Sequence, residues 1–79
     1  MTAMTMQVVD TNTLSINRQI QAKMKDIEGY EKLIRQREEW ISVLENRDKP
    51  NFKSVVQSRD MLKTNLEEAK YELHQLEQL

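Results

Sequence analysis

Isoleucine recurs every seven residues in the first half of this chain, and this spacing constrains the fold more than any other feature. The four residues are Ile20, Ile27, Ile34 and Ile41. A seven-residue apolar period is typical of a helix that packs along a seam against another helix. The companion seam positions are apolar at both ends and mixed in the middle: Ile16, Lys23, Tyr30, Arg37 and Leu44. The sequence therefore predicts a long helix with one continuous packing face.

A second heptad pattern follows the only proline, Pro50. Its two seam positions are occupied by Phe52, Arg59, Leu66 and Leu73 and by Val55, Leu62, Ala69 and Leu76. A count in steps of seven from Ile41 reaches Asp48 and then Val55. The isoleucine position of the first pattern therefore continues as the Val55 position of the second pattern, and not as the Phe52 position. The two patterns therefore belong to two helices, each with its own phase.

Pro50 determines how these helices are joined. Proline has no amide hydrogen and disfavours helical geometry at the preceding Lys49, whereas it suits the first turn of a new helix. We predict an all-α fold, an antiparallel two-helix hairpin of coiled-coil type, in residues 13–79. Its helices are expected at 13–47 and 52–78, with a loop at 48–51. A continuous helix kinked at Pro50 is the alternative. Residues 1–12 show no helical period and are predicted to form a flexible tail.

The order of charges supports a chain that folds back on itself. Residues 18–37 carry six basic and three acidic groups, whereas residues 67–79 carry four acidic groups and one basic group. An antiparallel hairpin places these two segments side by side. It also sets the acidic segment 38–45 beside the basic segment 47–63. Opposite charges then face each other along the whole length of the pair.

A single hairpin of this size has little core, because a chain of 79 residues buries few side chains between two helices. We therefore expect assembly into a four-helix bundle or a higher oligomer. Leu33, Trp40 and Met61 lie off the seams and are expected to form an apolar flank for a partner. The full set of expected interface residues is Ile20, Ile27, Ile34, Leu33, Trp40, Ile41, Met61, Leu62, Leu66 and Leu73.

Composition narrows the class of partner and the compartment. The chain carries 12 basic and 13 acidic residues, so its net charge of −1 gives no reason to expect nucleic acid as a partner. It has no cysteine and no apolar run long enough to cross a bilayer. We expect a cytoplasmic protein that binds itself and another protein, with no cofactor and no membrane insertion.

No set of residues has the pattern of a catalytic or metal site. His74 is the only histidine, and nucleophilic catalysis requires a base beside an activated nucleophile. Glu68 and Glu72 do not have the Glu-x-x-His spacing of di-iron bundles. Gly29 is isolated within the first helix and predicts a bend or the close approach of another helix. The sequence predicts that this protein is not an enzyme.

Two arginines occupy seam positions, where apolar residues are usual. Arg37 and Arg59 are expected to lie near each other in the hairpin and to fix its register through paired charges. The alternative is an anionic-ligand site, for a nucleotide or a similar molecule, formed by Tyr30, Arg37 and Arg59 from adjacent subunits. The sequence thus predicts a non-enzymatic protein–protein interaction module that acts as a chaperone, adaptor or inhibitor, with an oligomeric ligand binder as the alternative.

Overall fold

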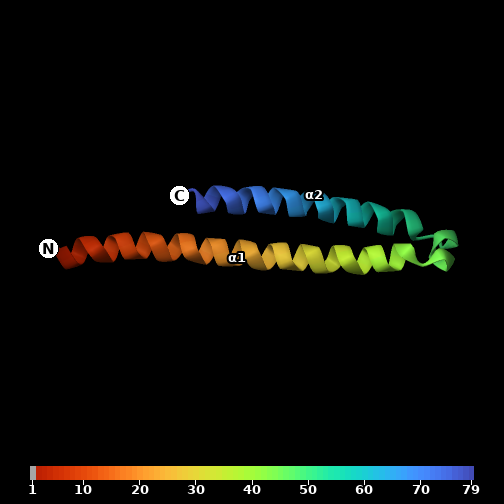
Figure 1. Ribbon diagram of the computed structural model, residues 1–79, viewed down its shortest axis with the longest axis horizontal. Helices are drawn as coiled ribbons and strands as arrows, with labels where there is room; N and C mark the ends of the chain where they lie inside the picture. Colours follow the sequence, from red (N-terminus) through yellow and green to blue (C-terminus); the bar gives the residue numbers. More distant parts are fainter. Residues whose placement is uncertain (1) are drawn as a thin grey trace.

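The structure is a computed structural model that describes the backbone of residues 2–79 and the side chains of residues 14–79. Helix α1 spans Thr2–Ser42, a short 3-10 helix η1 spans Leu44–Asp48, and helix α2 spans Phe52–Glu77. The chain turns back at η1, and α2 lies antiparallel along α1 (Figure 1). The predicted all-α hairpin is confirmed, and a continuous kinked helix is excluded.

The seam between the helices is formed by the side chains at the two heptad positions. Ile34 and Ala69 are the most deeply buried apolar residues described, at 7% and 5% exposure. The other seam residues within the two long helices are half-buried: Ile16, Ile20, Lys23, Ile27, Tyr30, Arg37 and Ile41 of α1, and Phe52, Val55, Arg59, Leu62, Leu66, Leu73 and Leu76 of α2. One side of each helix remains in water, because the hairpin has no third layer (Figure 1).

Two contacts between the helices give the antiparallel register. Arg37 of α1 donates through Nε to Ser58 Oγ of α2 at 3.3 Å. Lys23 lies two heptads before Arg37, and its Nζ donates to Glu72, which lies two heptads after Ser58. Because both contacts advance by the same number of residues, the register is constant along this part of the seam.

The reversal needs no residue in the left-handed region, since no described residue has positive φ. Val43 (φ −77°, ψ 119°) and Lys49 (φ −76°, ψ 143°) take extended conformations on either side of η1. The geometry of Lys49 is the one that a following proline imposes. Asn51 precedes α2, but its side chain makes no capping hydrogen bond.

The helix bounds differ from the predicted ones at both ends of α1. The helix ends at Ser42 instead of residue 47, because Val43 is extended and the next residues form tighter 3-10 turns. The backbone of residues 2–12, predicted as a flexible tail, continues α1 past the end of α2 (Figure 1). The side chains of this segment lie outside the described residues, and its mobility stays a prediction.

Candidate interaction surface

Most of the predicted interface residues lie in the seam within the chain. Seven of them, at positions 20, 27, 34, 41, 62, 66 and 73, are buried or half-buried between α1 and α2. Leu33 and Met61 are different, because they remain 37% and 67% exposed. These two residues are therefore available for a contact outside the hairpin.

Trp40 is packed at the loop end of the hairpin. Its ring centroid lies 6.2 Å from that of Phe52, with the two planes inclined at 30°. The Lys49 ammonium lies 5.9 Å from the Trp40 ring centroid, within cation–π range. The buried side chain of Asn46 donates to the Trp40 carbonyl oxygen at 2.7 Å. Trp40 is therefore half-buried by the turn and keeps only part of its ring exposed.

A groove opens between the helices next to Trp40. It is lined by Gln36, Arg37 and Trp40 of α1 and by Asn51, Ser54, Val55 and Ser58, which lie in or just before α2. Arg37 is the only charged residue of this lining, so the loop-end groove is weakly basic.

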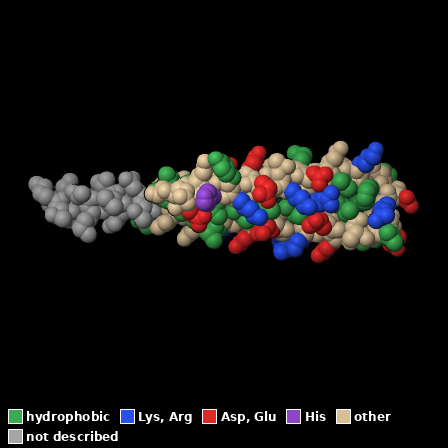
Figure 2. Space-filling model, turned by 45° about the horizontal axis from the view of Figure 1, so that its top comes forward, with side chains coloured by type: hydrophobic (Ala, Val, Ile, Leu, Met, Phe, Trp, Pro, Cys, Tyr) green, Lys and Arg blue, Asp and Glu red, His purple; other side chains and the backbone are tan. Residues whose placement is uncertain are grey.

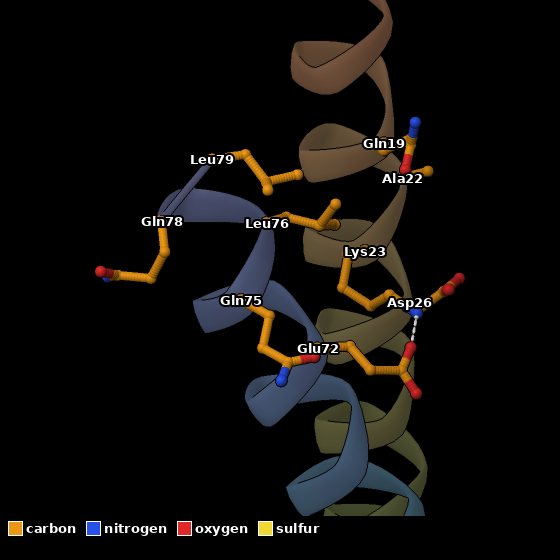
Figure 3. A pocket seen from close by; sticks show the side chains of 9 residues that line it. All are labelled: Gln19, Ala22, Lys23, Asp26, Glu72, Gln75, Leu76, Gln78 and Leu79. Atoms are coloured by element: carbon orange, nitrogen blue, oxygen red, sulfur yellow. Dashed lines mark hydrogen bonds and ion pairs between the residues drawn. The ribbon is translucent and has the colours of Figure 1, made fainter.

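A larger groove opens at the other end of the hairpin, where α2 ends (Figure 3). It is lined by Gln19, Ala22, Lys23 and Asp26 of α1 and by Glu72, Gln75, Leu76, Gln78 and Leu79 at the end of the chain. Leu76 and Leu79 point toward α1, and Lys23 and Glu72 form an ion pair across the groove. The hydrogen bond to Glu72 raises the pKa of Lys23 above its ordinary value of 10.5.

The two grooves lie on the same side of the hairpin. The lining includes residues that recur every seven positions, so the residues midway between the grooves lie on that side too. We call this side the grooved flank and define it by four residues of each helix: Gln19, Asp26, Leu33 and Trp40 of α1, and Ser54, Met61, Glu68 and Gln75 of α2. Leu33 and Met61 lie at its centre.

The opposite flank is different in character. Glu38 of α1 and Lys63 of α2 form an ion pair across it, with 3.5 Å between Lys63 Nζ and Glu38 Oε2. Met24 lies on this side and is exposed. Figure 2 shows one long face of the hairpin, on which hydrophobic side chains are exposed among basic and acidic groups.

The two seam arginines lie at the same level and bond to different acceptors. Arg37 donates to Ser58, the residue that precedes Arg59. Arg59 instead bonds to its neighbour Asp60, with both Nε and Nη2 at 3.0 Å from Oδ1. Tyr30, the third residue of the predicted anionic-ligand site, is half-buried one heptad before Arg37.

His74, the only histidine of the chain, is exposed near the end of α2. Among the residues that the structure describes, no three His, Asp or Glu side chains come together to hold a metal ion. No helix in the same part of the chain is both long and apolar enough to span a membrane.

Sequence reasoning missed the roles of Asn46 and the Lys49–Trp40 stack. The buried side-chain amide of Asn46 donates to the Trp40 carbonyl, which has lost its usual helical donor. An asparagine six residues after an aromatic residue and three residues before a Lys-Pro step is only a weak sequence signal for such a hydrogen bond. The grooves also depend on how far α2 extends along α1, which no local pattern gives.

Comparison with protein-family models, curated proteins and solved structures finds no match to this chain. Its function is therefore inferred from its own residues.

Proposed function

We propose that this protein is a non-enzymatic interaction module of the cytoplasm, an oligomeric helical hairpin that acts as a chaperone, adaptor or inhibitor of another protein. The observation that carries the proposal is the exposure of Leu33 and Met61 at the centre of the grooved flank. Apolar side chains grouped on one side of a small domain are typical of a protein-binding surface.

The exposed apolar side chains of the hairpin support a role in binding. Among the described residues no side chain is fully buried, and the large apolar side chains that stay exposed include Leu33, Met61, Tyr71 and Leu79. A second molecule that covers such side chains would add to the modest stability of one seam.

Charged substitutions on the grooved flank test the proposal. The variant Leu33→Glu with Met61→Glu should keep its helical circular dichroism, because both side chains lie outside the seam. It should lose its protein partners in a pull-down from the native host, since a buried unpaired carboxylate opposes binding.

Met24→Glu is the matched control, because Met24 is also an exposed methionine but lies on the opposite flank. This variant should retain the partners of the wild-type chain. If the Leu33 and Met61 double variant captures the same partners as wild type, the grooved flank is not the binding surface and the proposal fails.

A second candidate is a binder of an anionic ligand through Tyr30, Arg37 and Arg59 of adjacent subunits. The position of the two arginines at one level of the seam favours it. Each guanidinium already has an acceptor within the chain, so a ligand would have to replace or extend those contacts. Substitution of Arg59 separates this function from a role in register.

A further inference from the structure

We propose that a second copy of this chain covers the grooved flank. The two copies run antiparallel and are related by a two-fold axis that passes close to Leu33 and Met61. This inference rests on the proposed function and adds the identity and orientation of one partner. Under this symmetry α1 packs on α1 of the second copy and α2 packs on α2, each pair antiparallel. The result is a four-helix bundle with an isologous interface.

The spacing of the flank residues suits this symmetry. Asp26 and Trp40 lie one heptad on either side of Leu33. Ser54 and Glu68 lie one heptad on either side of Met61. We call the end of the hairpin where α2 ends its open end. A two-fold axis at the centre of the flank therefore sets the groove at the open end of each copy against the loop-end groove of the other copy. The exposed Leu33 and Met61 each meet their own counterparts at the axis.

The charges at the two ends of the flank are opposite in sign. The open end carries Asp26, Glu68 and Glu72, and Lys23 is already paired with Glu72. The loop end carries two basic residues, Arg37, which lines the groove, and Lys49, which covers Trp40. An antiparallel second copy brings each acidic end against a basic end. Such complementarity favours one orientation of the partner.

Gly29 lies on the same side of α1, one heptad after Ala22 and one heptad before Gln36, which both line the grooves. A Cβ added to Gly29 would meet nothing within 4 Å. Nothing within the described part of the hairpin therefore requires glycine there, although glycine weakens a helix. A glycine between the grooves lets the α1 helix of the second copy approach closely.

Single-cysteine variants of the full chain test the position of the axis, because the protein has no cysteine of its own. A residue on a two-fold axis lies next to its own counterpart. Leu33→Cys and Met61→Cys should therefore each form covalent dimers with diamide or a short bis-maleimide. Glu31→Cys is the matched control, since Glu31 is exposed on the opposite flank of α1, and it should remain monomeric on a denaturing gel.

Three results would overturn the proposal. The first is cross-linking at Leu33 and Met61 no faster than at Glu31. The second is cross-linking that requires a mixture of the Leu33→Cys and Met61→Cys chains, since that pairing places α1 against α2 of the second copy. The third is a wild-type chain that sediments as a monomer at high micromolar concentration. A second copy and another protein would compete for the same flank, and the double glutamate variant disrupts both contacts. The cross-linking therefore reports on the second copy alone, and the pull-down reports on capture of another protein.

Charge reversal tests the antiparallel orientation of the two copies. Glu68→Lys and Lys49→Glu should each weaken self-association by about tenfold or more, because each creates a like-charge contact in the dimer. The double variant should recover the wild-type dimer. A hairpin that was merely destabilised would not be restored by a second charge reversal. Single variants that associate as strongly as wild type would contradict the proposed orientation.

Discussion

The side-chain amide of Asn46 donates a hydrogen bond to the backbone carbonyl oxygen of Trp40 at 2.7 Å, and Asn46 is only 6% exposed. The Val43 amide bonds to the same oxygen at 3.3 Å. Because Val43 is extended, α1 cannot supply its usual donor to this carbonyl. Asn46 therefore completes the end of α1 and ties η1 to it.

Asn46→Ala should reduce the free energy of unfolding by about 1–3 kcal/mol, because it removes a donor from a partly buried carbonyl. Urea unfolding followed by circular dichroism, at one fixed protein concentration, measures the change. The control is Asn51→Ala, since Asn51 is exposed and its side chain makes no capping hydrogen bond. That variant should stay within about 0.5 kcal/mol of wild type. Equal effects of the two substitutions would show that the Asn46 contact does not stabilise the turn.

Ile34 and Leu44 both occupy predicted seam positions, but the structure separates them. Ile34 is 7% exposed, whereas Leu44 lies in η1 and is 70% exposed. Ile34→Ala should cost about 2–4 kcal/mol through lost burial and a cavity, and Leu44→Ala should cost less than about 0.5 kcal/mol. The difference in urea midpoint between the two variants checks this. Similar losses would mean that the seam continues into the turn.

Lys23 and Glu72 should make the stability of the hairpin depend on alkaline pH. The hydrogen bond to Glu72 raises the pKa of folded Lys23 above 10.5. A pKa raised by folding stabilises the protein below the unfolded value, and this contribution is lost as the pH rises through the folded value. The wild-type chain should therefore be more stable than Glu72→Gln at about pH 9, and the difference should shrink above about pH 11.

Glu67→Gln provides the control for this measurement, because Glu67 approaches Lys70 only within its own helix, at 4.0 Å. Its urea midpoint should follow that of wild type at every pH. A difference between wild type and Glu72→Gln that stays constant up to the highest pH would rule out the ion pair as its source.

Arg59→Leu tests whether the seam arginines fix the register or bind a ligand. Arg59 is half-buried in the seam, and replacing a partly buried charge with an apolar side chain should stabilise the hairpin by about 1 kcal/mol. Arg35→Leu, at an exposed position of α1, should change stability by less than about 0.5 kcal/mol. Thermal unfolding measures both. Loss of function with assembly intact would favour the anionic-ligand site.

The heptad patterns predicted the seam almost residue by residue. Ile20, Ile27, Ile34 and Ile41 are all buried or half-buried, as are the eight seam residues predicted after Pro50. The charge order also predicted which segments pair, and the ion pairs Lys23–Glu72 and Glu38–Lys63 join them. Leu44 is the exception among the predicted seam residues described, because the helix ends before it.

The amino-acid sequence by itself determined the two helices, their packing faces and the reversal at Pro50, since periodicity, charge order and the missing amide hydrogen of proline are local properties of the chain. Only the tertiary structure decided where α1 ends, that the Asn46 side chain completes it, and that Leu33 and Met61 lie on one flank between two grooves. These features depend on the length of the turn and on the relative register of two distant segments. Both are set by packing between the helices, which no single stretch of sequence specifies.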